Sequence, residues 1–194
     1  ELQGEEGEIS LCTLSAINWG LINETKDFEK YCNLAVRALD ELLDYQDYPV
    51  QAARRGTMDR RPLGIGIINL AYFLAKRGLK YDESAFETVD EYAEAWSYYL
   101  IKASADLAEE KGEINLNNQT KYSRGVLPID TYKSAINNLI GHTERMKWDE
   151  LRTQLKATGI RNSTLMALMP AETSAQISNS TNGIEPPRAL VSYK

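Results

Sequence analysis

Short apolar segments typical of β-strands alternate with longer stretches of helical periodicity along this chain. Strand-like segments occupy residues 8–17, 63–69 and 163–169; the first carries Cys12, and the second is either a short buried strand or a tight turn. Apolar side chains recur at helical spacing over residues 23–43 and 84–111. Because helices that separate strands usually connect parallel neighbours, this order predicts an α/β fold with largely parallel strands.

Residues that end helices, together with charged residues, indicate the remaining helices and loops. Further helices are expected over residues 70–77, 130–140 and 148–158, and a loop over residues 113–129. A terminal strand is expected at residues 189–194, where it would need a partner strand. On residues 23–43 the predicted buried face comprises Phe28, Tyr31, Leu34, Ala35, Ala38, Leu39 and Leu42. A polar connector between the first helix and the second strand-like segment carries Arg54, Arg55, Arg60 and Arg61, which either steer phosphate groups or are simply solvated.

The composition excludes several classes of protein. A net charge of −6 argues against a general nucleic-acid or anionic-membrane surface. Two cysteines are too few for a secreted disulfide framework, and no apolar run has the length of a membrane span, so a cytoplasmic protein is expected. The single histidine, His142, lies in a polar loop without a carboxylate cluster of ligand spacing, so no metal site is predicted.

The stretch from Leu168 to Arg188 contains the most distinctive local chemistry. Pro170 cannot donate a backbone hydrogen bond and suits an element boundary. Residues 171–174 would then offer free backbone N–H groups and two hydroxyls, those of Thr173 and Ser174, at the positive end of a helix dipole. This pattern fits either a phosphate-binding turn or an ordinary helix cap.

Other candidate sites have simpler structural interpretations. Cys12 is either a small buried strand residue or a reactive thiol, whereas Cys32 lies on an apolar helix face and is expected in the core. The glycines at Gly64 and Gly66 imitate a dinucleotide-binding loop, but no strand precedes them, so a tight strand-to-helix turn is the interpretation. The adjacent Tyr98–Tyr99 pair suggests radical transfer, yet its mid-helix position indicates one core and one flanking aromatic.

Six sequence blocks together resemble the large, catalytic subunit of aerobic class I ribonucleoside-diphosphate reductases. They follow one another in the family's order over almost the entire chain. The blocks are residues 7–16 (GEISLCTLSA), 35–40 with 43–49 (AVRALD, LDYQDYP), 63–69 (LGIGIIN), 127–133 (LPIDTYK), 161–165 (RNSTL) and 169–188. The resemblance implies a helix-rich part, mainly the second half, of a ten-stranded α/β barrel that is built from two parallel five-stranded halves.

The same resemblance implies the chemistry. The family reduces ribonucleoside diphosphates to deoxyribonucleoside diphosphates by thiyl-radical chemistry with a redox-active cysteine pair, and Cys12 matches one member of that pair. Pro170, Ala171, Glu172, Thr173 and Ser174 match the loop that holds the substrate diphosphate, although some relatives have Ser where this chain has Ala171. Thioredoxin or glutaredoxin would supply the reductant. A separate metal-containing small subunit would supply the radical, and nucleotide effectors would bind elsewhere.

The family pattern also predicts what this chain needs from other polypeptides. The radical cysteine with its Asn and Glu would precede residue 1, and a tyrosine pair and a cysteine-bearing tail would follow residue 194. Residues 1–194 are therefore expected to be a single partial barrel segment, not an independent domain, and inactive alone. It would complete an active site with the remaining large-subunit polypeptide. The alternative is a non-catalytic remnant or split-protein fragment that acts only as a folding or assembly partner.

Overall fold

Parallel strands lie at the centre of the structure. The computed structural model describes residues 7–138, 144–189 and 191. Strand β1 (Leu14–Asn18) pairs in parallel with β2 (Gly64–Ile68), with Leu14 opposite Gly64. On the other edge of β2, residues 163–167 run in parallel and form a bridge between Ile65 and Met166. The strand-helix alternation therefore predicted the parallel arrangement correctly.

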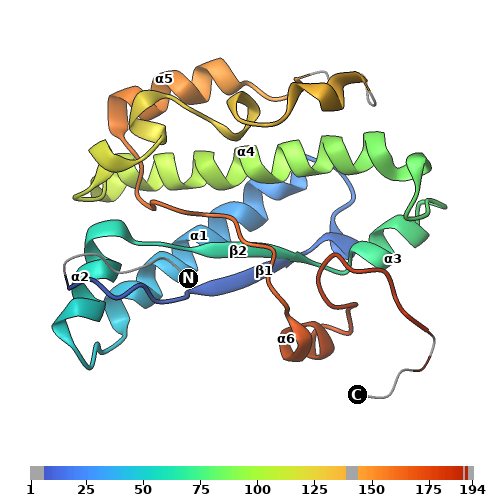
Figure 1. Cartoon of the computed structure of the whole chain (residues 1–194), viewed down its shortest axis with the longest axis horizontal. Helices are drawn as coiled ribbons and strands as arrows, with labels where there is room; N and C mark the ends of the chain where they lie inside the picture. Colours follow the sequence, from blue (N-terminus) through green and yellow to red (C-terminus); the bar gives the residue numbers. More distant parts are fainter. Residues whose placement is uncertain (1–6, 139–143, 190, 192–194) are drawn as a thin grey trace.

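Helices lie on both sides of these strands, with the long ones on one side only (Figure 1). The long helices α1 (Asp27–Tyr45) and α4 (Phe86–Lys111) pack against each other on one side. Helix α5 (Trp148–Thr158) packs on α4, farther from the strands, and the short α6 (Glu172–Ile177) lies on the opposite side of the sheet from α4. The remaining α-helices are α2 (Gln51–Arg60), before β2, and α3 (Leu70–Ala75), after it.

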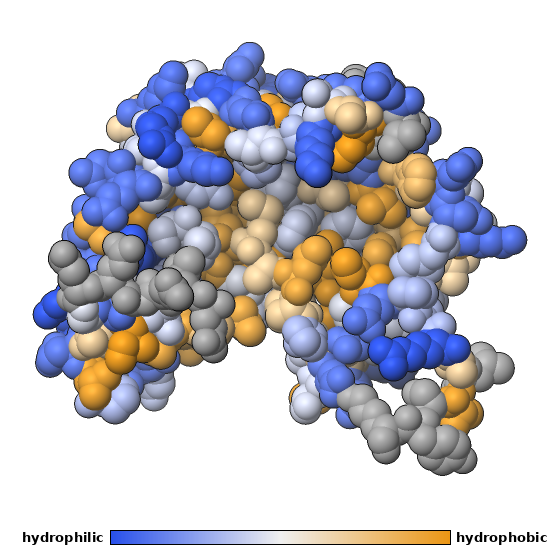
Figure 2. All heavy atoms as spheres, in the orientation of Figure 1, coloured by the Kyte–Doolittle hydropathy of each residue, from blue (hydrophilic) through white to orange (hydrophobic). Residues whose placement is uncertain are grey.

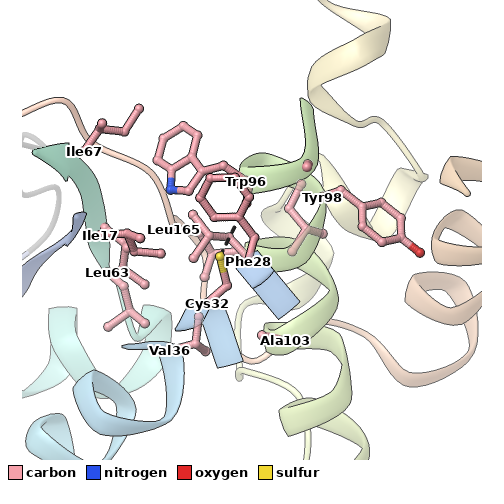
Figure 3. Close-up of a cluster of buried hydrophobic side chains, with 14 of the residues drawn as sticks. Ile17, Phe28, Cys32, Val36, Leu63, Ile67, Trp96, Tyr98, Ala103 and Leu165 are labelled. Atoms are coloured by element: carbon pink, nitrogen blue, oxygen red, sulfur yellow. Dashed lines mark hydrogen bonds between the residues drawn. The ribbon is translucent and has the colours of Figure 1, made fainter. Parts of the chain in front are cut away.

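A large apolar core fills the space between the strands, α1 and α4. Figure 3 shows Cys32 among Phe28, Val36 and Trp96, and the Cys32 thiol lies 3.8 Å from the carbonyl oxygen of Trp96. Cys32 is fully buried, as expected, and this burial raises the pKa of its thiol well above the usual range. Tyr98 is buried and Tyr99 partly buried, which confirms the expected core and flanking pair.

The opposite face of the strands, called the open face below, is only partly covered, because Leu14 is exposed there although Gly64, Gly66 and Ile68 are buried. Side chains alternate along a strand, so Ile65 and Ile67 join the large core whereas Gly64, Gly66 and Ile68 face the other way. Ile68 packs there against Ala171 and Ala175 of α6. A Cβ on Gly66 would lie 2.5 Å from the carbonyl oxygen of Ala167, so glycine permits the third parallel segment to approach closely.

Two predictions near the N-terminus were wrong. Residues 8–17 do not form one strand, because the pairing with β2 begins only at Thr13. The N–H of Ile9 instead donates to the carbonyl oxygen of Ala52 in α2 (3.1 Å). Cys12 therefore precedes β1. The expected polar connector contains α2, and Arg61 just after it is 3% exposed rather than solvated.

The predicted buried face of α1 was also partly wrong. Tyr31, Leu34 and Leu42 are exposed, and the buried stripe is rotated toward Cys32 and Val36. Helix α1 makes its main contacts with α4, and the buried stripe lies toward that helix. The full buried set of α1 is Phe28, Cys32, Val36, Leu39, Asp40 and Leu43.

Later segments differ from expectation as well. The helix expected at residues 130–140 is replaced, over its described part, by short 3-10 turns at Pro128–Asp130 and Ser134–Asn138, and residues 139 and 140 lie outside the described residues. Residues 163–169 form one bridge rather than a full strand. Of the predicted terminal strand, Ala189 and Val191 are not in a strand. Residues 190 and 192–194 lie outside the described residues.

Candidate functional site

A helix starts after Pro170, as expected, but the backbone N–H groups of the turn before it are not all free. Helix α6 begins at Glu172, directly after Pro170 and Ala171. The N–H of Ala171 is not free, because it donates to Oδ1 of Asn182 at 2.7 Å. Ser174 Oγ donates to the carbonyl oxygen of Ala171 at 3.2 Å. The N–H groups of Thr173 and Ser174 belong to the first turn, where an α-helix has no internal acceptors.

A pocket of about 400 Å³ adjoins this turn. The end of β2, the segment after the parallel residues 163–167 and residues 182–185 surround it. Figure 2 shows that the same face of the molecule is hollowed between the α2 region and the α6 region, with apolar side chains gathered over the strands. The pocket is lined by Ile67, Leu168, Met169, Pro170, Asn182, Gly183, Ile184 and Glu185.

Cys12 is an exposed free thiol two residues before β1. The ladder still reaches Thr13, whose carbonyl oxygen accepts from the N–H of Gly64 at 2.9 Å. A Cβ on Gly64 would lie 2.6 Å from Cδ2 of Leu14, so Leu14 lies on the open face. Because side chains alternate along extended chain, Cys12 falls on this same face. Of the two alternatives for Cys12, the small buried strand residue is wrong, because Cys12 is exposed and precedes β1.

Three contacts hold the segment that carries Cys12 against α2. Glu8 forms an ion pair with Arg60 at 2.8 Å, and the N–H of Ile9 bonds to Ala52. A Cβ on Gly56 would lie 2.6 Å from the carbonyl oxygen of Ile9, so glycine lets the segment lie flush on the helix. Helix α2 thus supports the chain immediately before the thiol, which the sequence did not reveal.

The strand register places the two candidate sites at opposite ends of one face. Cys12 precedes the first pair of the β1–β2 ladder, Leu14 and Gly64. Pro170 follows Met166, which bridges to Ile65, and so lies beyond the other end of the strands. A ligand that touched both would have to extend lengthwise over the open face of the sheet.

A buried ion-pair network lies near the start of β2. Arg61 Nε donates to Oδ1 of Asp40 at 2.6 Å, and its Nη2 donates to Oδ2 of Asp44 at 2.7 Å. Asp40 also accepts from Nδ2 of Asn162 at 3.0 Å and Nε of Arg161 at 3.3 Å. Burial by itself would lower the pKa of Arg61, but its bonds to the two carboxylates raise it. Because all these groups are paired within the network, Arg61 has a structural role rather than phosphate steering.

Other kinds of site have little support among the described residues. Within residues 7–138, 144–189 and 191, no group of three or more potential ligands from His, Cys, Asp and Glu could hold a metal ion. His142 lies outside this part of the chain. None of the described helices is both long and apolar enough to cross a membrane.

Comparisons with known proteins agree with this geometry. A family model described as "Ribonucleotide reductase, barrel domain" matches residues 2–194. The chain is 54% identical over 194 residues to the ribonucleoside-diphosphate reductase subunit alpha of Haemophilus influenzae, covering 100% of the chain and 26% of that relative. It is 46% identical over 197 residues to the subunit alpha of Enterobacteria phage T4, again covering 100% of the chain and 26% of the relative.

A third relative matches a shorter part of the chain. The ribonucleoside-diphosphate reductase 1 subunit alpha of Escherichia coli is 56% identical over 153 residues, which is 78% of this chain and 20% of that protein. The chain thus spans about a quarter of the length of the relatives that it matches throughout. Its parallel strands and covering helices are part of an α/β barrel, and the chain belongs to the ribonucleotide reductase barrel-domain family.

Proposed function

We propose that this chain forms part of the substrate site of a ribonucleoside-diphosphate reductase. The proposal rests on the exposed Cys12, which strand alternation places on the open face just before β1, and on the turn of residues 170–174, which packs on that face, in a chain of this family. The substrate would be a ribonucleoside diphosphate, and the product the corresponding deoxyribonucleoside diphosphate. The sugar would extend toward Cys12, and the diphosphate would lie on the turn.

In this proposal Cys12 is one of two reducing thiols. Cys12 and a cysteine on another part of the large subunit together give up two hydrogen atoms, the 2′-hydroxyl leaves the sugar as water, and the two sulfurs form a disulfide. Thioredoxin or glutaredoxin then reduces the disulfide by thiol exchange. The exposure of Cys12 supports this role, because exchange requires that a partner sulfur reach the thiol.

The initiating radical would come from outside this chain. A cysteine of the remaining large-subunit polypeptide would start the reaction at the 3′ position, after a separate metal-containing small subunit had supplied the radical. Nucleotide effectors would bind elsewhere on the large subunit. The chain alone is therefore inactive in this proposal.

The turn would hold the diphosphate chiefly through its first helical residues. The N–H groups of Thr173 and Ser174, the Thr173 hydroxyl and the positive end of the α6 dipole all favour an anion. Glu172 would contribute its backbone, and Pro170 would fix where the strand segment ends. Ala171 lacks a hydroxyl and its N–H is bonded to Asn182, so it would contribute packing under the turn.

The free edge of β1 supports association with the remaining large-subunit polypeptide. Within the described residues β1 pairs only with β2. A groove of about 270 Å³ beside it is lined by apolar residues that include the exposed Leu21 and Leu34. A strand with one unpaired edge beside exposed apolar side chains is suited to pairing with another chain. This feature is equally compatible with the alternative of a non-catalytic assembly partner.

Reassembly with the complementary polypeptides separates the two functions. The chain is mixed with the rest of a large subunit and with the small subunit, and thioredoxin-dependent reduction of a ribonucleoside diphosphate is measured. We expect Cys12→Ser to abolish turnover and Ser10→Ala, two residues earlier, to retain it. Undiminished turnover by Cys12→Ser would refute the assignment of Cys12. Assembly without any turnover, even for the unsubstituted chain, would favour the non-catalytic alternative.

A further inference from the structure

Asn69 occupies an unusual position at the end of β2. Its φ angle is 68°, in the left-handed region where asparagine is one of the few tolerated side chains. The residue is only 5% exposed, so its amide group needs hydrogen-bond partners inside the protein. It stands between β2 and α3 and is not part of the turn of residues 170–174.

The Asn69 amide connects two segments that are distant in sequence. Its Nδ2 donates to Oδ1 of Asn18, at the end of β1, at 2.9 Å. Its Oδ1 accepts from the N–H of Thr181 at 3.1 Å, and the N–H of Asn69 donates back to the carbonyl oxygen of Thr181 at 2.9 Å. Asn18 Nδ2 in turn donates to Oγ of Ser180 at 2.8 Å. The loop after α6 is thereby bonded to the ends of both strands.

The next residue of that loop extends the connection to the diphosphate-binding turn. Asn182 follows Thr181 directly, and its Oδ1 accepts the N–H of Ala171 at 2.7 Å. Hydrogen bonds thus connect Asn18 through Asn69 to Thr181, and the backbone carries the connection to Asn182 and its hydrogen bond with Ala171. Gly20 closes the far side of the Asn69 amide, since a Cβ at this position would collide with Nδ2.

Apolar packing alone would leave the orientation of α6 poorly defined. Ala171 and Ala175 pack on Ile68, but this contact is small and has no directional preference. Hydrogen bonds depend steeply on angle, so the asparagine network fixes the rotation and height of the turn above the strands. Cys12 lies before the other end of β1, the strand to which the network is bonded.

We infer that Asn69 is a positioning residue that fixes the turn of residues 170–174 relative to the strands. It acts through Thr181 and Asn182 and does not itself touch the substrate. This inference rests on the proposed function for its purpose, since a diphosphate held at a fixed height would direct the sugar toward Cys12. Its structural part, the coupling of Asn69 to the Ala171 N–H, can be measured without a substrate.

The test compares two identical substitutions at left-handed asparagines. Asn69→Gly keeps the backbone angle accessible and removes the amide. Asn179→Gly, at φ 50° on the exposed loop after α6, is the matched control, because its exposed side chain makes no hydrogen bond within the part of the chain that the structure describes. Amide hydrogen exchange of the complete chain is followed by NMR. We expect exchange at Ala171 to rise about tenfold in Asn69→Gly, the effect of losing roughly one hydrogen bond, and to stay unchanged in Asn179→Gly.

A purely structural role for Asn69 gives a different pattern. Faster exchange at Thr181 without any change at Ala171 would overturn the inference, as would a uniform increase that includes the core amides of α4. Where Asn69→Gly fails to fold, Gly20→Ala provides the second variant. It retains Asn69 but displaces its amide, and the same local increase at Ala171 is expected.

Ligand binding then distinguishes this inference from the proposed function. Binding of inorganic pyrophosphate and of cytidine diphosphate to the chain is measured by calorimetry. If the unsubstituted chain binds these ligands and Asn69→Gly binds them about tenfold more weakly, the result supports both the positioning role and the proposed site. Equal affinities in the two proteins would overturn the positioning role while leaving the proposed site. Absence of binding to the unsubstituted chain would count against the proposed turn, and the exchange result at Ala171 would still decide the coupling.

Discussion

Replacing Arg61 with methionine tests the buried network that supports the start of β2. The guanidinium side chain is 4% exposed and the Asp40 carboxylate 0%, so the variant leaves a buried charge without its main partner. Breaking a buried ion pair costs about 3–5 kcal/mol. Asp40 would retain Asn162 and Arg161, so we expect about 3 kcal/mol, at the lower end of that range.

The predicted loss is measured by thermal unfolding of the chain. For a protein of this size it corresponds to a fall in melting temperature of roughly 6–12 °C. Arg60→Met is the matched control, because Arg60 is the preceding residue and its ion pair with Glu8 has side chains that are 30% and 20% exposed. A partly exposed pair contributes less than about 1 kcal/mol.

A second substitution tests the cause. Adding Asp40→Asn to Arg61→Met removes the unpaired charge, so we expect the double variant to be more stable than Arg61→Met alone. Equal losses from Arg61→Met and Arg60→Met would refute the argument from burial. A further loss in the double variant would show that the Asp40 charge was not the source of the destabilisation.

The remaining predictions concern the thiols, a carboxylate and a glycine. Iodoacetamide should modify Cys12 in the folded chain and Cys32 only after unfolding, which mass spectrometry of the peptides would reveal, since Cys12 is exposed and Cys32 buried. The hydrogen bond from Arg61 lowers the pKa of Asp44 below 3.8, so its stabilisation is complete above pH 3.8 and is lost as the pH falls through the folded-state value. The destabilisation by Asp44→Asn in urea unfolding should therefore shrink below pH 3.8. Gly66→Ala should cost about 1–3 kcal/mol in the same assay, because the added Cβ would lie 2.5 Å from a backbone oxygen.

Several elements follow from the sequence with little help from the rest of the fold. The helix expected at residues 84–111 is α4, and the one expected at residues 148–158 is α5. Both have apolar residues at helical spacing and a glycine directly after the last turn, which are local signals. The order of the family's sequence blocks, including the strand with Gly64 and Gly66, was sufficient to predict the family.

Other elements depend on contacts that no local pattern contains. Helix α2 is strongly polar, so it has little apolar periodicity, and its contacts with Glu8 and Ile9 come from a segment distant in sequence. The helix expected after residue 130 is replaced by tight turns, because Asp130 Oδ2 accepts the N–H of Leu127 at 2.7 Å and bonds to Arg152. These interactions stabilise a turn that helix propensity alone would not predict.

The candidate site divides in the same way. The sequence by itself indicated the candidate residues: a cysteine that it placed on a strand, and a proline followed by hydroxyl residues at a helix start. Only the tertiary structure decided that Cys12 is exposed, that the Ala171 N–H is bonded to Asn182, and that Asn69 connects the turn to both strands. The physical reason is that exposure and hydrogen bonding depend on partners 11 to 112 residues away, whereas a sequence pattern reports mainly on neighbours within a few turns of the chain.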